Sequence, residues 1–273
     1  MRQRMSTLER TTTIGVIIPT YNRPELLGEA LTSVQAQSWP AWRAFVIDDA
    51  STLSYASAQA QVGDDDRIEF IRKDQNEGIN AARNVGIERA LDAGVDFLIF
   101  LDDDDVFADD YFETVLQQVD KHPAYGWFMS NNCGERKSST RDIVGEGEMD
   151  FVDDYIYRKF RGDKAHLFAA PLLRDVRMDA RFRSSHRWGF YIKLATKTKI
   201  WAFPHPSIRK HYLEGGITRS STGKRPKSLR EVTHRFAKHW YVIRVRPTKL
   251  AAYKYFLLEL VKTPGRLIRL LWR

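Results

Sequence analysis

Short apolar runs alternate with stretches of helical periodicity over residues 13–131. The runs are rich in Ile, Val and Phe and are bounded by turn or polar residues, as strands buried on both faces are. They predict strands at Ile14–Ile18, Phe45–Ile47, Ile68–Ile71 and Phe97–Leu101.

Between these runs, apolar residues recur at the spacing of a helix that covers a core. Pro24 suits a first helical turn, so a helix is predicted from Pro24 to about Gln37. A second is predicted over Ile79–Ala93 with Gly94 as its stop, and a third over Asp109–Val119 with acids in its first turn. Strands that alternate with helices predict an α/β fold with a doubly wound, mainly parallel (mixed) sheet and helices on both faces.

The second half of the chain has a weaker pattern. Residues 135–154 are polar and contain glycine, which predicts a mobile or inserted loop. Helices are predicted at Leu229–Val245 and Leu250–Val261, after which Pro264–Gly265 breaks the pattern. These two helices form a basic helical C-terminal extension.

Charge is unevenly distributed along the 273 residues. From Ser207 to the end there are 17 Lys and Arg against three acids, a net charge of +14. Subtracting this from the +8 of the whole chain leaves −6 for the first 206 residues. The basic segment is therefore expected to meet an anionic surface. Nucleic acid is not expected as a partner, because its recognition motifs are absent and the other half is acidic.

Cysteine content and hydropathy indicate a cytoplasmic protein. The single cysteine, Cys133, cannot form an intramolecular disulfide, and residues 1–10 lack the apolar core of a signal peptide. No stretch reaches the roughly 18 uncharged apolar residues of a membrane-spanning helix.

Four consecutive acids, Asp102 to Asp105, directly follow the strand predicted at Phe97–Leu101. They would repel one another unless something positive lay among them. In an open α/β sheet, ligands bind at this carboxyl edge of the strands. Carboxylate oxygens suit Mg²⁺ or Mn²⁺, with room left for diphosphate oxygens. The alternative is an acidic helix cap, but caps rarely need so many adjacent acids.

Three other polar segments lie near predicted strand ends or helix starts. PTYNRP ends the first strand, where Thr20 and Tyr21 could hold a base by hydrogen bonding and stacking. VIDDAS brings Asp49 to the end of the second strand, and NEGINAARN carries Arg83. Arg83 suits a nucleotide base or phosphate, with a surface salt bridge as the alternative. Together the segments predict a ligand site at the sheet edge.

In order and spacing, PTYNRP, VIDDAS, NEGINAARNVGI and FLDDDD resemble the family 2 glycosyltransferases, which are inverting enzymes of GT-A fold. The resemblance covers roughly residues 13–131. It implies a nucleotide-diphosphate sugar donor, most often a UDP-sugar, and a divalent Mn²⁺ or Mg²⁺. Asp102 and Asp104 map onto the DxD motif, with Asp104 as a metal ligand. The implied donor-binding residues are Thr20, Tyr21, Asp49, Arg83, Asp102 and Asp103.

The resemblance also implies a division of the chain. Residues 1–12 are an N-terminal tail and 13–218 a GT-A catalytic domain, followed by the extension at 219–273. Within the domain, 13–131 is the nucleotide-sugar-binding half and 132–218 the acceptor-binding half.

A nucleotidyltransferase is the rival enzyme class. It would need a glycine-rich, basic phosphate loop after the first strand, and PTYNRP is not one.

The acceptor half departs from the family pattern E-D-W-x-F-x-x-x-L. His186 and Arg187 occupy the acidic positions, although the aromatic spacing is kept. Arg187 cannot act as a base, whereas a neutral His186 could accept the hydroxyl proton. The alternatives are a catalytically inactive binding module or a base elsewhere, among Asp150, Asp153 and Asp154.

The segment RKHY resembles the late R-x-H segment of many relatives. A histidine in this place completes the metal shell in some GT-A enzymes, so His211 is a candidate metal ligand. The alternative is a surface histidine among basic residues.

Leucines and aromatics interleave with Lys and Arg over residues 249–273. This pattern favours a helix in a membrane interface, where each cation near an anionic leaflet contributes about 1 kcal/mol. The alternative is packing on the domain or in a dimer. We expect a peripheral protein at the inner face of the plasma membrane, with a saccharide or lipid-linked acceptor in envelope polysaccharide or lipopolysaccharide assembly.

Overall fold

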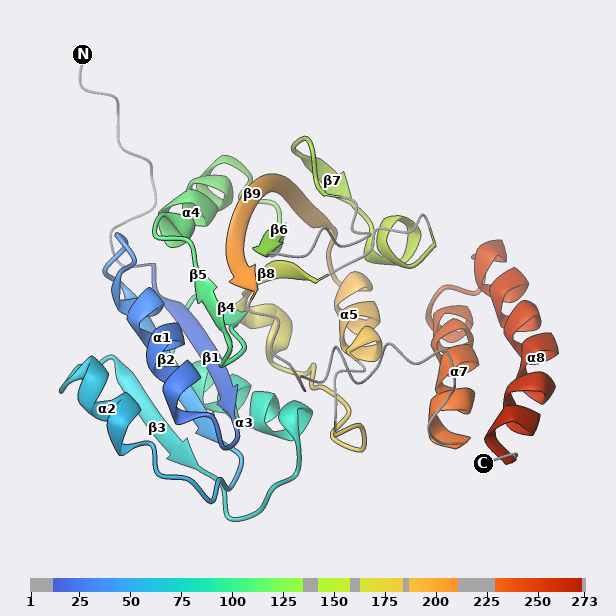
Figure 1. The fold of residues 1–273 in the computed structure, drawn as a ribbon. Coiled ribbons are helices and arrows are strands. Elements are labelled where there is room, and N and C mark those ends of the chain that lie inside the picture. The colour runs from blue at the N-terminus through green and yellow to red at the C-terminus, as the bar shows by residue number, and fades with distance from the viewer. Residues whose placement is uncertain (1–11, 135–141, 158–162, 184–186, 211–228, 272–273) are drawn as a thin grey trace.

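A computed structural model describes residues 12–134, 142–157, 163–183, 187–210 and 229–271. The strands of this part of the chain are β1 (Ile14–Thr20), β2 (Trp42–Asp48), β3 (Ile68–Arg72), β4 (Phe97–Phe100), β5 (Asp105–Phe107), β6 (Trp127–Gly134), β7 (Gly147–Met149), β8 (Lys164–Ala169) and β9 (Ile200–Lys210). They form one sheet in the order β3-β2-β1-β4-β8-β6-β9-β5, with β7 paired to β9 (Figure 1).

The sheet is mixed, as the sequence predicts. Strands β3, β2, β1 and β4 are parallel neighbours. Strand β8 then runs antiparallel to both β4 and β6, whereas β6 and β9 are parallel. The carboxyl ends of β1, β2 and β4 therefore meet the start of β8 at one edge.

Helices cover both faces of the sheet, which confirms the predicted α/β architecture. One face packs against α3 (Ile79–Asp92) and α5 (Trp188–Ala195), and the other against α1 (Pro24–Gln35), α2 (Ala56–Val62) and α4 (Tyr111–Lys121). Successive residues of β1 alternate between these two cores, as the period of a strand requires. Each fully buried aliphatic or aromatic side chain contributes roughly 1.5–3 kcal/mol.

Helix α3 approaches β1 closely because of a glycine. A Cβ on Gly86 would lie 2.3 Å from Cγ2 of Ile17, so only glycine fits without displacement. This close packing brings the first turns of α3, including Arg83, towards the carboxyl edge of the sheet.

Two segments differ from the prediction. The region expected to be a loop over 135–154 contains β7 and a π-helical segment, η1 (Phe151–Tyr157), because Phe151 and Val152 are buried in the core. The expected break at Pro264–Gly265 is also wrong, since α8 (Leu250–Leu271) continues through Pro264. A proline removes one backbone hydrogen bond, and here the helix tolerates that loss.

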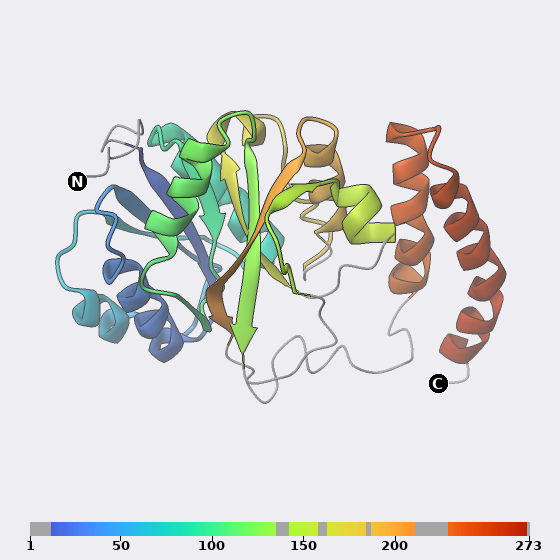
Figure 2. The ribbon, with the colours of Figure 1, turned by 90° about the horizontal axis from the view of Figure 1, so that it is seen from above.

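The C-terminal helices form a hairpin beside α5 (Figures 1 and 2). Helix α7 (Leu229–Val245) lies against the domain, with Val242 and Ile243 in the core, and α8 packs on α7 through Ala252. The rings of Trp188 and Tyr241 meet at 6.0 Å. Among the described helices, none combines the length and apolarity needed to cross a bilayer.

A cluster of polar contacts anchors the hairpin at its turn. Nη1 of Arg246 donates to both carboxylate oxygens of Asp150 at 2.8 and 2.7 Å, and Nη2 donates to the carbonyl of Ala195 at 2.6 Å. Lys199 donates to the same Asp150 at 2.9 Å. One face of α8 stays uncovered, as shown by the large exposed fractions of Leu250 (81%), Leu257 (60%) and Val261 (78%).

Candidate donor and metal site

The polar motifs converge at the edge where the parallel strands end. Thr20 pairs with Asp48 across β1 and β2, and Ile17 pairs with Phe100 across β1 and β4. The Asp-rich run begins two residues after Phe100 and therefore lies beside the end of β1.

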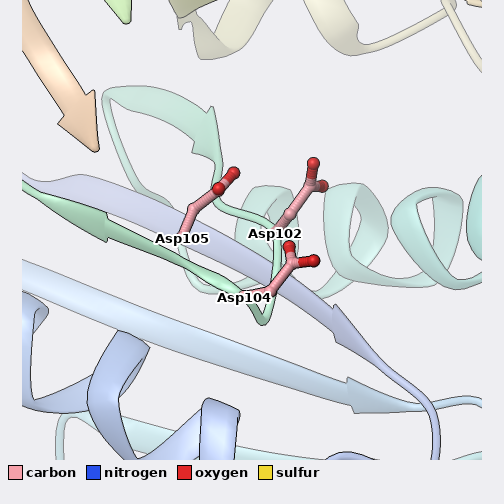
Figure 3. A group of neighbouring side chains, drawn as sticks. All are labelled: Asp102, Asp104 and Asp105. Carbon is pink, nitrogen blue, oxygen red and sulfur yellow. The ribbon is translucent and has the colours of Figure 1, made fainter. Parts of the chain in front are cut away.

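The run Asp102 to Asp105 forms a tight turn into β5. The amide of Asp105 donates to the carbonyl of Asp102 at 3.1 Å. Three carboxylates, from Asp102, Asp104 and Asp105, each have an oxygen within 4.8 Å of the others, and Figure 3 shows them on one side of the turn. Asp103 makes different contacts, because it accepts a hydrogen bond from the Thr20 hydroxyl at 2.8 Å.

Three cations compensate the charge of this turn. Arg83, whose side chain is 2% exposed, pairs with Asp102. Lys210 at the end of β9 bridges Asp102, at 3.3 Å, and Asp105. Arg23 reaches Asp104 at 3.2 Å from the start of α1. The turn thus lies in a ring of positive groups suited to a diphosphate.

Burial and charge act in opposite directions on these carboxyl groups. Burial alone would raise the pKa of Asp102, but Lys210 and Arg83 hold that pKa well below its usual range. Burial raises the pKa of Asp103 to about 6 and that of Asp105 to about 7, although Arg23 and Lys210 act against it. Burial and the charge of Asp102 also raise the pKa of Asp104. Burial therefore works against ionisation of Asp103, Asp104 and Asp105, whereas the cations around Asp102 keep its carboxylate ionised.

The three clustered carboxylates fit a divalent cation. Their oxygens are hard ligands, and one oxygen from each carboxylate lies within 4.8 Å of the others. Asp102, Asp104 and Asp105 would hold the ion, so Asp105 joins the candidates that the sequence singled out. His211, the other sequence candidate for the metal, lies outside the described residues.

Thr20 and Tyr21 have different environments. Thr20 is buried, and its hydroxyl lies 2.8 Å from that of Tyr55 while donating to Asp103. Tyr21 is 44% exposed and free to stack on a ligand. Thr20 therefore positions the Asp-rich turn.

Asp49 anchors the loop before α3. It accepts hydrogen bonds from the amides of Gly78 at 2.7 Å and Glu77 at 3.1 Å, and from Lys73 at 2.6 Å. Gly78 has a φ of 94°, and a Cβ there would lie 2.6 Å from the carbonyl oxygen of Arg183. This loop thereby ties the second strand end to the segment that precedes α5.

Arg83 is not the surface ion pair considered as an alternative. It is 1% exposed, lies under the Phe100 ring at 5.8 Å, and salt-bridges the first acid of the turn. Its Nε has no hydrogen-bond partner among the described residues.

Arg23, Tyr55, Asp105 and Lys210 belong to the site but were not singled out from the sequence. Arg23 lies within PTYNRP and Asp105 within the acidic run, so the motifs that contain them could have identified both. Lys210 could be found only through the pairing of β9 with β5, which puts it opposite Asp105. Nothing in the sequence marks Tyr55.

The acceptor side is partly described. His186 lies outside the described residues, whereas Arg187 precedes α5 with Nη2 3.6 Å from a carboxylate oxygen of Asp163. Burial lowers the pKa of Arg187, but Tyr191, Asp163 and Asp102 together hold that pKa above its usual value. Arg187 thus stays a cation in the place where the family pattern has an acid.

The three alternative bases are engaged elsewhere. Asp150 is paired with Lys199 and Arg246, Asp153 pairs with Lys249, and Asp154 accepts the amide of Asp150 at 2.8 Å. Two of these cations, Arg246 and Lys249, belong to the C-terminal hairpin.

Comparison with known sequences gives a consistent result. The family described as "Glycosyl transferase family 2" matches residues 15–177, more than half of the chain. The chain is 31% identical over 176 residues to a GalNAc(5)-diNAcBac-PP-undecaprenol beta-1,3-glucosyltransferase of Campylobacter jejuni, covering 62% of this chain and 55% of that protein. It is 35% identical over 125 residues to succinoglycan biosynthesis protein ExoW of Rhizobium meliloti, covering 45% and 39%. The chain thus spans about half or less of these relatives.

Solved structures share the fold. The S. aureus TarS 1–349 structure in complex with UDP-GlcNAc has a TM-score of 0.74 at 18% identity, covering 91% of this chain and 71% of that one. The mannosyltransferase PcManGT from Pyrobaculum calidifontis, in complex with GDP-Man and Mn²⁺, has a TM-score of 0.57 at 17% identity, covering 96% and 73%. With the sheet order and the Asp-rich turn, these findings agree: the chain is a GT-A protein that belongs to glycosyl transferase family 2.

Proposed function

We propose that the protein transfers a sugar from a nucleotide-diphosphate donor, most simply a UDP-sugar, to a hydroxyl of a saccharide or lipid-linked acceptor. The observation that carries the proposal is the Asp102–Asp105 turn, which is ringed by cations at the end of β4. Similarity to a glucosyltransferase whose name gives an undecaprenol-linked substrate, and to TarS with UDP-GlcNAc, supports donor and acceptor classes. Assembly of an envelope polysaccharide or lipopolysaccharide is consistent with this donor class and this acceptor class.

The donor lies across the ends of β1, β2 and β4 in this proposal. Tyr21 stacks on the base, Thr20 and Asp49 border the nucleotide, and Asp102 and Asp103 meet the ribose. Arg83 stays paired beneath, holding Asp102 in place. Lys210 and Arg23 neutralise the diphosphate, since both already contact the acidic turn.

Asp102, Asp104 and Asp105 are the residues for Mn²⁺ or Mg²⁺, with His211 as the sequence candidate for a further ligand. When bound there, the ion supplies Lewis-acid stabilisation of the charge on the leaving diphosphate. Because Lys210 bridges two of the same carboxylates, its ammonium must shift or share them with the ion.

The reaction is a single displacement with inversion. The acceptor oxygen attacks the anomeric carbon from the face opposite the diphosphate, and the cations described above take up the charge that develops there. The acceptor proton passes to a base on the acceptor side, for which the sequence offers His186.

The C-terminal hairpin provides attachment to an anionic membrane in this proposal. Leu250, Leu257 and Val261 project from the uncovered face of α8, and the exposed Lys254 and Lys262 belong to the same helix. Apolar side chains beside cations are typical of helices in a membrane interface. This arrangement would hold the enzyme near a lipid-linked acceptor at the cytoplasmic face.

Membrane binding can be measured by sedimentation with phosphatidylglycerol vesicles. The pair Leu257→Ser and Val261→Ser should reduce the bound fraction severalfold, whereas Leu53→Ser, a change at a residue 49% exposed elsewhere, should not. Equal binding of both variants would contradict the membrane role.

Donor turnover tests the function itself. UDP release is followed from UDP-GlcNAc and UDP-glucose, with GDP-mannose as a comparison, in Mn²⁺ and a polyprenyl-diphosphate-linked saccharide. Acceptor-dependent release from one donor is expected. Binding of a nucleotide without turnover of any donor would favour the alternative, a catalytically inactive nucleotide-sugar-binding module.

A further inference from the structure

An inverting transferase needs a group that removes the acceptor proton, so the inference that follows rests on the proposed function. The family's acidic pair is replaced by His186 and Arg187. Asp150 and Asp153 are paired with cations, and Asp154 accepts a hydrogen bond from the amide of Asp150. A general base among the described residues must therefore be a different carboxylate, one near the proposed donor site.

Asp163 occupies such a position. It immediately precedes β8, and β8 runs antiparallel to β4 with Leu167 opposite Ile99. The start of β8 therefore lies at the edge where β4 ends and Asp102 follows. The Asp163 side chain is 58% exposed, so an acceptor hydroxyl can reach it.

The charges around Asp163 link it to the metal turn. Its carboxylate lies 3.6 Å from Nη2 of Arg187, and Arg187 also acts electrostatically on Asp102. Burial lowers the pKa of Lys210, but among the acids Asp102 and Asp105 raise that pKa most, and the charge of Asp163 raises it next. Asp163 thus lies close enough to Arg187 and Lys210 to interact with both, and each of these cations also acts on Asp102.

Arg187 is itself held in place, which gives Asp163 a fixed neighbour. Its guanidinium lies 5.9 Å from the centre of the Tyr191 ring on α5. At this position a cation replaces the family acid, and that cation contacts Asp163, the residue before β8.

His166 on β8 is excluded as the base by its hydrogen bond. The indole Nε1 of Trp127 can only donate, and it donates to Nδ1 of His166 at 3.1 Å. The neutral ring then carries its proton on Nε2 and offers no free lone pair. Burial, with the charges of Arg187 and Lys164, lowers the pKa of His166 to about 3, so the ring stays neutral.

We propose that Asp163 is the general base of this enzyme and that Arg187 positions it. A carboxylate oxygen of Asp163 takes the proton of the acceptor hydroxyl. The acceptor oxygen forms the new bond to the anomeric carbon, while the bond from that carbon to the β-phosphate oxygen breaks. Its electron pair leaves with the nucleoside diphosphate, and Asp163 later returns the proton to solvent.

The test compares Asp163→Asn with Asp142→Asn. Asp142 is a close match, being 62% exposed and paired at 3.5 Å with Lys164, the residue next to Asp163, yet it has no contact with Arg187 among the described residues. Turnover is measured as UDP release with the donor and acceptor that the wild type uses. UDP binding in Mn²⁺ is measured separately by calorimetry.

Asp163→Asn should lower kcat about 10²- to 10⁴-fold, the usual contribution of a general base, with UDP affinity unchanged. Asp142→Asn should stay within about threefold of wild type. Asp163→Glu should recover part of the rate because a carboxylate is restored.

Three results would overturn the assignment. Asp163→Asn could keep wild-type turnover, or both Asn variants could lose it equally, which would indicate a general effect of charge. Loss of turnover in His186→Ala with an active Asp163→Asn would assign the base to His186. If the wild type turns over no donor, the proposed function fails, whereas an active wild type with active Asp163→Asn removes only the base.

Discussion

Replacing Arg246 by Met should loosen the C-terminal hairpin from the domain. Arg246 donates three hydrogen bonds, two to Asp150 and one to the carbonyl of Ala195. Asp150 is 7% exposed and Arg246 25%, so the pair is largely shielded from water. Breaking a buried ion pair costs roughly 3–5 kcal/mol. Because Lys199 remains on Asp150, the expected loss is about 2 kcal/mol, near the value of one hydrogen bond to a charged group.

The assay combines thermal unfolding with hydrogen exchange. A loss of about 2 kcal/mol lowers Tm by about 4–8 °C in a chain of this size, and amides of α7 should exchange faster than those of β1 and β2. Arg244→Met is the control, because Arg244 is exposed in the last turn of the same helix. Equal Tm for the two variants would show that the contacts of Arg246 do not hold the hairpin on the domain.

The same contact predicts a pH dependence. Burial raises the pKa of Asp150, but its hydrogen bonds from Lys199 and Arg246 outweigh burial and lower that pKa to about 2. A lowered carboxyl pKa stabilises the folded state above the unfolded value of about 3.9, and this stability is lost as the pH falls through 2. The wild type should therefore lose more hairpin stability than Arg246→Met between pH 4 and pH 2. Parallel pH curves for the two proteins would contradict this origin.

Other changes test the packing around the site and the hairpin. Gly86→Ala should destabilise the protein by about 1–3 kcal/mol in urea unfolding, because its Cβ would clash with Ile17; an unchanged midpoint would refute the tight approach of α3. Gly78→Ala should weaken UDP binding severalfold in calorimetry by displacing the loop that Asp49 anchors, and unaltered affinity would detach this loop from the donor site. Burial lowers the pKa of His239 to about 4, so hairpin stability should fall as the pH drops from about 6.5 to 4. His239→Gln should flatten that dependence in hydrogen exchange, and a persisting slope would implicate another group.

The parallel half of the fold was predictable from the sequence. Its strands are continuous apolar runs because both faces are covered, and its helices carry ordinary start and stop signals, such as Pro24 and Gly94. The antiparallel half was not predictable in the same way. Strand β9 contains Pro204 and Pro206, which argue against a strand, and β5 has three residues.

The site followed the same division. Residues on strand ends, such as Thr20 and Asp49, could be named because parallel strands share one carboxyl edge. Lys210 could not be named, and neither could Asp163, the base proposed above, since a strand pairing distant in sequence brings each towards this edge. Sequence order alone could not separate the four acids of the turn, where Asp103 bonds to Thr20 whereas Asp105 joins the cluster with Asp102 and Asp104.

The most direct test of the account is metal-dependent nucleotide binding by the Asp-rich turn. Thermal stability is measured with UDP, GDP, CMP and dTDP, with and without Mn²⁺, for the wild type and Asp104→Asn. At 100 times its dissociation constant a ligand adds about 2.7 kcal/mol to stability. We expect UDP to stabilise the wild type only with Mn²⁺ and Asp104→Asn to lose this effect. Equal stabilisation of the two proteins, or no stabilisation by any nucleotide, would contradict it.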